Sequence, residues 1–122
     1  MTLLHTCSYG AYRPWFGQPV VASLTLPKRI PEAARWPRCS PITPRWEYFR
    51  KDPDGAAYLA QLERYGQQVI ARQLEAIARQ YQAGALVILC FEADGRPGSC
   101  HRGRFSSWWL ETTGELITEI GP

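Results

Sequence analysis

Apolar side chains fall into four short segments of the chain, and each segment has the length and composition of a β-strand. The clearest covers residues 86–91, which together with Ala85 form an unbroken apolar run rich in branched side chains. Such a run is typical of a strand buried on both faces, as in a parallel sheet. The other predicted strands cover residues 3–7, 20–26 and 116–120, and we expect the last to lie at an edge of the sheet.

Between the second and third predicted strands, apolar residues recur at helical spacing over residues 56–83. This period places them on one face, which favours a helix packed against a core. We expect Asp54 to cap its N-terminus, Gly66 to kink or divide it, and Gly84 to end it. A shorter helix is predicted over residues 104–113, between the third and fourth strands.

Strands that alternate with helices predict an α/β fold with a parallel sheet, because parallel strands need a crossover connection. At 122 residues the chain has the length of one domain. We therefore expect a single small three-layer α/β domain, with right-handed crossovers and a short, mainly parallel sheet of about four strands. Open sheets of this kind bind ligands at the carboxyl ends of their strands.

Residues 27–53 differ from the rest of the chain, with six prolines, four large aromatic residues, and seven basic residues against three acidic ones. Proline at this density breaks both helices and strand ladders. The aromatic residues argue against disorder, because they bury large areas. We expect an ordered, largely extended arm that lies over the domain and forms no separate domain. Its basic and aromatic residues also suit single-stranded nucleic acid as a further candidate partner.

Composition adds detail to this picture. Twelve of the fourteen basic residues are arginine, which suits phosphate and carboxylate ligands, although GC-rich coding explains the same bias equally well. No stretch approaches 18 consecutive apolar residues, and no basic segment followed by a long apolar run opens the chain. We therefore expect a cytoplasmic protein with no membrane partner, whose four cysteines are reduced.

Chemically active side chains gather where the third predicted strand ends. Glu92 follows the strand directly, a turn rich in glycine and proline comes next, and Cys100, His101 and Arg102 then stand in a row before a helix. A helix N-terminus carries partial positive charge and free N–H groups, so this junction suits an anion. Arg102 is the candidate anion ligand and Glu92 the candidate general base, and the same field would lower the pKa of the Cys100 thiol.

If the first and third strands are neighbours, a second group of side chains reaches the same edge of the sheet. Residues 8–17 form a loop rich in aromatic residues, which either builds a wall for a planar ligand or merely covers the sheet. Two basic residues that follow the second strand would close the rim of the pocket. The predicted ligand-binding residues are thus Ser8, Tyr9, Arg13, Lys28, Arg29 and Arg102, and the predicted catalytic residues are Glu92, Cys100 and His101.

Residues 89–92 (LCFE) and 100–102 (CHR) resemble the motif of the YeaO-like family, a group of small conserved α/β proteins that form a domain of unknown function. The resemblance implies a small α/β fold. The family has no settled activity, so the resemblance implies no function. It covers most of the chain and extends to residues 4–9, residues 21–24 with Pro27, and the pair Arg64-Tyr65 before the long helix.

Three functions follow from these residues. In the first, the protein binds a small phosphorylated or nucleotide-like ligand and, in an extended form of this hypothesis, also processes it through Glu92 and residues 100–102. In the second, Cys100 is the nucleophile of a thiol enzyme, although adjacent helical residues point about 100° apart, which makes a pair of Cys100 and His101 awkward. In the third, the protein is a non-enzymatic sequestering or inhibitory factor, for example a mobile-element factor that captures a signalling nucleotide.

No common nucleotide-binding, hydrolase or metalloprotease motif is present, so no cofactor is predicted. A metal site built from Cys90, Cys100, His101 and either Glu92 or Cys7 is disfavoured, because adjacent Cys and His ligands suit the usual structural zinc sites poorly. We therefore predict no metal.

Overall fold

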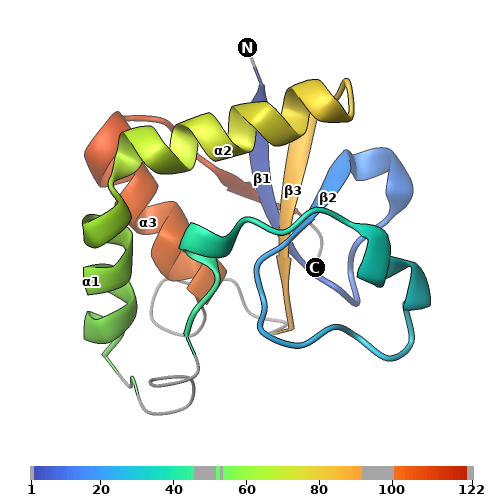
Figure 1. Ribbon diagram of the computed structural model, residues 1–122, viewed down its shortest axis with the longest axis horizontal. Helices are drawn as coiled ribbons and strands as arrows, with labels where there is room; N and C mark the ends of the chain where they lie inside the picture. The colour runs from blue at the N-terminus through green and yellow to red at the C-terminus, as the bar shows by residue number, and fades with distance from the viewer. Residues whose placement is uncertain (1, 46–51, 53, 92–100, 121–122) are drawn as a thin grey trace.

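The computed structural model describes residues 2–45, 52, 54–91 and 101–120 of the chain. Within these residues, four parallel strands form one sheet in the order β2-β3-β1-β4 (Figure 1). The predicted α/β fold with a parallel sheet is confirmed. The strands are β1 (Leu3–Ser8), β2 (Gln18–Val21), β3 (Ala85–Cys90) and β4 (Thr118–Glu119).

The side chains of β3, which lies between β2 and β1, alternate between two apolar cores. Leu86 and Ile88 belong to one core, and Val87 and Leu89 belong to the other. None of the four is more than 1 % exposed. Burial on both faces explains why the sequence of this strand is an unbroken apolar run.

One face of the sheet is covered by three α-helices, α1 (Ala56–Tyr65), α2 (Gln67–Gln80) and α3 (His101–Thr113) (Figure 1). The opposite face is covered by the connections on either side of β2, which contain the short 3-10 helices η1 (Pro14–Phe16) and η2 (Pro31–Arg35). We call this the loop-covered face. Among the described residues, no helix is both long and apolar enough to span a membrane.

The long predicted helix is divided at Gly66, whose φ of 85° lies in the region that glycine adopts without strain. Its start differs from the prediction. Asp54 accepts one backbone hydrogen bond, but the carboxylate of Asp52 accepts two, from the N–H groups of Ala57 and Tyr58 at 3.0 Å each. Asp52 therefore supplies most of the capping at this helix N-terminus.

The prediction that Gly84 ends the helix is wrong. α2 ends at Gln80, and Gln82 takes the left-handed conformation with φ of 52°. The N–H of Ala83 then donates to the carbonyl of Ala78 at 2.8 Å, which closes the helix before Gly84 is reached. A glycine near the end of a helical pattern is a common signal for a C-cap, but here a glutamine takes that position.

The second strand also departs from its predicted range of residues 20–26. β2 begins at Gln18, includes Pro19 and ends at Val21. Proline is tolerated because β2 is an edge strand that pairs with β3 on one side only. Beyond Val21 the Ser23 hydroxyl donates to the carbonyl of Thr25 at 2.6 Å, and this side-chain bond competes with continued strand pairing.

The arm is described as far as residue 45, and residues 46–51 and 53 of its predicted range lie outside the described residues. It is less extended than predicted, because η2 and a third 3-10 helix, η3 (Ser40–Ile42), form within it. The arm also pairs with the outer edge of β2. The N–H of Val21 donates to the carbonyl of Pro37 at 2.8 Å, and the N–H of Cys39 donates to that of Val21 at 3.2 Å. The arm thus covers part of an edge that would otherwise be open to pairing.

Cys39 anchors the arm in the core, where its side chain is fully buried. Burial raises its pKa from 9.0 to about 12, because the thiolate loses its hydration there. The folded state therefore holds the thiol proton more tightly than the unfolded state. This contribution to stability is complete below pH 9 and is lost as the pH rises toward 12. We expect the free energy of unfolding to fall by about 1.4 kcal/mol per pH unit in this window.

Urea denaturation of the wild type and of Cys39→Ala, from about pH 8 to about pH 10.5, measures this effect as a difference between two slopes. The comparison is needed because burial also raises the pKa values of Cys7, Tyr9 and Tyr12, which contribute to both proteins. Equal slopes in the two proteins would contradict the prediction.

Candidate functional site

The carboxyl ends of β1 and β3 lie side by side. Ser8 stands opposite Cys90 in the parallel register, and the N–H of Tyr9 donates to the carbonyl of Cys90 at 3.1 Å. This neighbourhood was the basis of the site predicted from the sequence. Two of its members, Glu92 and Cys100, lie outside the described residues, so their roles stay predictions.

Arg102 lies under this edge of the sheet and is 1 % exposed. α3 begins at His101, three residues earlier than predicted, so Arg102 lies within its first turn and is buried against the strands. Its Nε donates to the two carboxylate oxygens of Glu119 at 3.0 and 3.1 Å, and its Nη2 donates to Oε2 at 2.8 Å. Arg102 is therefore buried and paired within the fold, whereas the sequence suggested an anion ligand placed before the helix. Its predicted role in ligand binding stays a prediction.

Glu119 compensates the charge of Arg102. The Thr6 hydroxyl donates to Glu119 Oε1 at 2.7 Å, and Arg102 Nη1 donates to Cys90 Sγ at 3.0 Å. These contacts join α3 to strands β4, β1 and β3. In such a bidentate pair the charge of the guanidinium is compensated and most of its N–H groups are engaged. It is therefore a weak ligand for a second anion.

His101 is half-buried beside Arg102, with its ring edge-on to that of Tyr58 at a centroid distance of 4.9 Å. It lines a cavity of about 40 Å³ together with Cys90 and Phe91. A cavity of this volume holds one or two water molecules. This cavity is much smaller than a nucleotide.

Ser8 and Tyr9 make contacts within the fold. The Ser8 hydroxyl accepts the N–H of Ala11 at 3.2 Å. The Tyr9 hydroxyl lies 2.7 Å from that of Ser23, to which it donates because the Ser23 proton goes to the carbonyl of Thr25. Burial raises the pKa of the Tyr9 phenol, so this proton is retained. The Tyr9 ring packs in the core of the loop-covered face.

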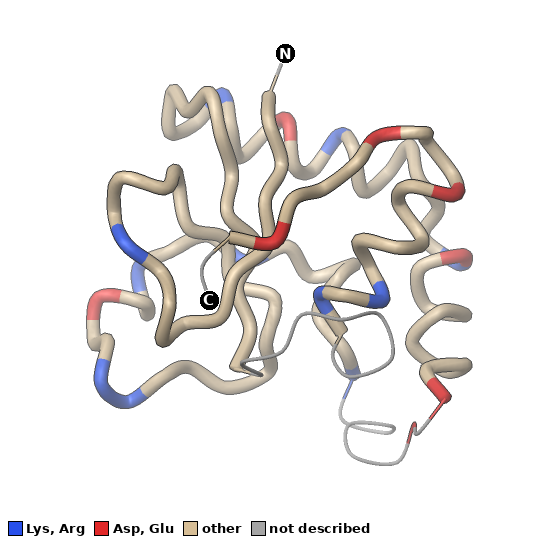
Figure 2. The backbone as a smooth tube through the Cα atoms, turned by 180° about the vertical axis from the view of Figure 1, so that it is seen from behind, with Lys and Arg blue, Asp and Glu red and all other residues tan. Residues whose placement is uncertain are grey.

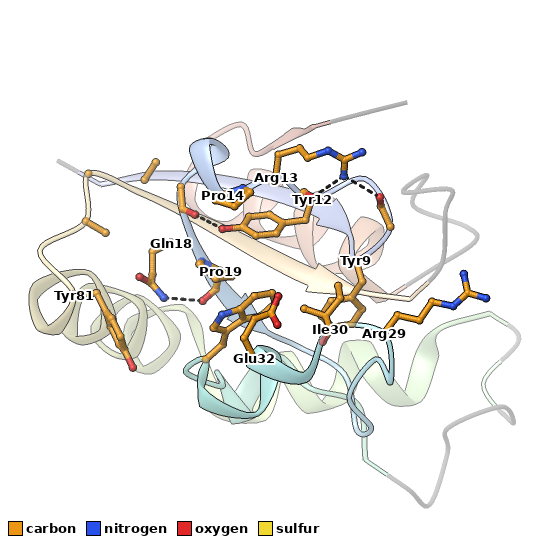
Figure 3. Close-up of a pocket in the computed structure, with 16 residues that line it drawn as sticks. Tyr9, Tyr12, Arg13, Pro14, Gln18, Pro19, Arg29, Ile30, Glu32 and Tyr81 are labelled. Atoms are coloured by element: carbon orange, nitrogen blue, oxygen red, sulfur yellow. Dashed lines mark hydrogen bonds between the residues drawn. The ribbon is translucent and has the colours of Figure 1, made fainter.

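A groove of about 940 Å³ runs along the loop-covered face (Figure 3). Tyr9, which is hydrogen-bonded to Cys90 at the end of β3, lines one end of the groove. Residues 83–85, where β3 begins, line the other end. Tyr12 and Trp36 also line it and form an edge-to-face pair with ring centroids 5.6 Å apart. The Tyr12 hydroxyl is fixed by the carbonyl of Gly17 at 2.7 Å. These rings offer a planar ligand a surface for stacking.

Three charged side chains line the groove: Arg13, Arg29 and Glu32. Figure 3 shows Arg13 and Arg29 on opposite walls at the end near Tyr9, with Glu32 farther along toward Tyr81. Nη1 of Arg13 donates to two carbonyls of its own loop at 3.2 and 2.8 Å. The side chains of Arg29 and Glu32 form no hydrogen bond or ion pair with any other residue in the described part of the chain.

The groove thus brings together three of the predicted ligand-binding residues, Tyr9, Arg13 and Arg29. Ser8, Lys28 and Arg102 do not line it. In the aromatic loop over residues 8–17, Tyr12 lines the groove and Phe16 packs on the sheet. That this loop serves a planar ligand stays a prediction. The sequence did not point to Glu32, Trp36 and Tyr81; its one signal was the mixture of aromatic and charged residues in the arm.

The described residues contain no group of three or more His, Cys, Asp or Glu side chains placed to hold a metal ion. Cys7 and Cys90, two of the candidate ligands, lie on different sides of the sheet. Cys7 is in the core of the loop-covered face, and Cys90 contacts Arg102 of α3 on the face that the helices cover.

Comparison of the chain with protein-family models, with curated proteins and with solved structures finds no match. The resemblance to the YeaO-like family therefore stays a prediction.

Proposed function

We propose that this protein binds a small anionic ligand with a planar ring, of the nucleotide type, in the groove on the loop-covered face. The observation that carries the proposal is the guanidinium of Arg29, which has no partner among the described residues and stands opposite Arg13 at one end of an aromatic groove. Arginine pairs favourably with phosphate, and aromatic rings stack on bases. At about 940 Å³ the groove is as large as the pockets that hold small ligands.

The groove is favoured over the cluster around Arg102 for two reasons. The charge of Arg102 is already compensated by Glu119, and the cavity beside it holds one or two waters. The sequence-based prediction of a nucleotide-like ligand is therefore kept, and its site moves to the other face of the sheet. Whether the ligand is also processed depends on Glu92 and Cys100 and stays a prediction.

An extended nucleic acid is a weaker candidate partner. Figure 2 shows acidic positions interspersed with the basic ones along the coloured part of the tube, so no continuous basic track is visible from this side. Proteins that bind single strands combine a basic groove along the backbone with stacking rings. Here the basic residues of the groove sit at one end, which suits one terminal phosphate group.

We expect Arg29→Ala to weaken binding of nucleoside monophosphates about tenfold, because one charge-assisted hydrogen bond is lost. Isothermal titration calorimetry with the four nucleoside 5′-monophosphates and the common cyclic nucleotides measures the affinities. Arg35→Ala is the matched control, since Arg35 is exposed on the same arm and does not line the groove. Equal affinities of the two variants, or no binding of any nucleotide to the wild type, would refute the proposal.

The same titrations distinguish a sequestering protein from an enzyme. Chromatography of the ligand after prolonged incubation returns it unchanged if the protein only binds it, and returns a product if the protein processes it.

A further inference from the structure

Glu32 is an acid that has no hydrogen-bond or ion-pair partner in the described part of the chain, and it lines a groove that we propose for anions. It lies in the first turn of η2, and its side chain is exposed along the groove. Arg29 and Arg35 are each three positions away in the sequence, yet neither forms an ion pair with it. The local sequence offers two ways to neutralise this carboxylate, and the described structure uses neither.

An unpaired carboxylate in this position opposes the binding of a simple anion, because like charges repel. A carboxylate accepts hydrogen bonds and donates none. The ligand that fits the groove therefore carries its negative charge at the end with Arg13 and Arg29 and carries O–H or N–H donors next to Glu32. Figure 3 shows these groups in that order, with Tyr81 beyond them.

We propose that Glu32 recognises the ribose hydroxyls of the ligand, so that the groove selects ribonucleotides over 2′-deoxyribonucleotides. This inference rests on the proposed function. A ribonucleotide presents phosphate, then a vicinal diol, then a planar base, and the groove presents cations, then a carboxylate, then Tyr81 in the same order. Two neighbouring hydroxyls match the two oxygens of one carboxylate, as acidic residues do at the ribose of other nucleotide sites.

The groove is long enough for phosphate, ribose and base to lie one after another along β3. The groove follows β3 from Ala85, its first residue, to Tyr9, whose N–H bonds to the last residue, Cys90. Five steps of about 3.3 Å along a parallel strand make this about 17 Å. With the phosphate at the Tyr9 end, the ribose comes next to Glu32 and the base points toward Tyr81.

The test compares the four ribonucleoside 5′-monophosphates with their 2′-deoxy counterparts by calorimetry, in the wild type and in Glu32→Ala. Because Glu32 is exposed to solvent, we expect the wild type to prefer the ribonucleotide about tenfold, the value of one hydrogen bond to a charged group. In Glu32→Ala the preference should fall to about twofold or less. Glu111→Ala, which removes an exposed acid of α3 outside the groove, should keep the preference.

Two results would overturn the inference while leaving the proposed function in place. In the first, the wild type binds both sugars equally and Arg29→Ala weakens both. In the second, the preference survives in Glu32→Ala. A tetramethylammonium ion that binds the wild type and loses affinity in Glu32→Ala, with no ribose preference, would show that Glu32 serves a cationic ligand and would also overturn the inference. If no nucleotide binds at all, the proposed function fails and the inference fails with it.

Discussion

Replacing Arg102 with alanine is expected to lower the free energy of unfolding by about 3–5 kcal/mol. Arg102 is 1 % exposed, and its guanidinium donates three hydrogen bonds to Glu119 and one to Cys90. Its removal leaves the carboxylate of Glu119, only 32 % exposed, without its counter-charge. It also removes the polar contacts that Arg102 of α3 makes with β3 and β4. Urea denaturation at neutral pH measures the loss.

The loss of stability is large because the single substitution leaves one charge of the pair uncompensated. A double variant that removes both charges tests this explanation. Arg102→Met with Glu119→Leu replaces both partners by apolar groups of similar volume, and this double variant should recover most of the lost stability. Arg35→Ala, at an exposed site, should change stability by less than about 0.5 kcal/mol. A stable Arg102→Ala protein that has lost nucleotide binding would mean that Arg102 serves the ligand, as the sequence alone had suggested.

The fold could be predicted because its signals are local. The unbroken apolar run of β3 indicated a strand that is buried on both of its faces. The alternation of strands with helical patterns favoured a parallel sheet. Once a parallel sheet was predicted, the carboxyl ends of β1 and β3 were expected to be adjacent, and Ser8 does lie opposite Cys90. The errors occurred where a single residue decides a boundary, through its side chain at Ser23 after β2 and through its backbone conformation at Gln82 after α2.

The site was harder to predict because its residues come from distant parts of the chain. The groove joins the loop after β1, the arm, and the turn that follows α2, and no spacing in the sequence connects them. The row of Cys100, His101 and Arg102 drew attention because it is contiguous. Its arginine is paired with Glu119, which lies 17 residues away and belongs to no sequence motif that would predict the pairing. Only the three-dimensional structure distinguishes a buried, paired arginine such as Arg102 from Arg29, which has no partner among the described residues.

The arm forms one wall of the groove, so the contacts that hold the arm also hold the candidate site. Gln61 of α1 is 1 % exposed, and its Nε2 donates to the carbonyls of Pro41 at 2.8 Å and Thr43 at 2.7 Å. The same stretch is tied to α1 by the Tyr58 hydroxyl, which donates to the carbonyl of Ile42 at 2.6 Å.

Gln61→Ala is expected to lower the free energy of unfolding by about 2–4 kcal/mol, because it leaves two buried carbonyls without a donor and opens a cavity in the core. Gln73→Ala, at an exposed position of α2, is the control and should cost less than about 0.5 kcal/mol. Because the lost bonds belong to the arm, hydrogen exchange should accelerate over residues 27–45 before it does in β1 and β3. Uniform acceleration over the whole domain would instead show that Gln61 supports the core in general and that the arm has no separate anchor. A variant as stable as the wild type would mean that water replaces the amide at both carbonyls, and the groove wall would then not depend on Gln61.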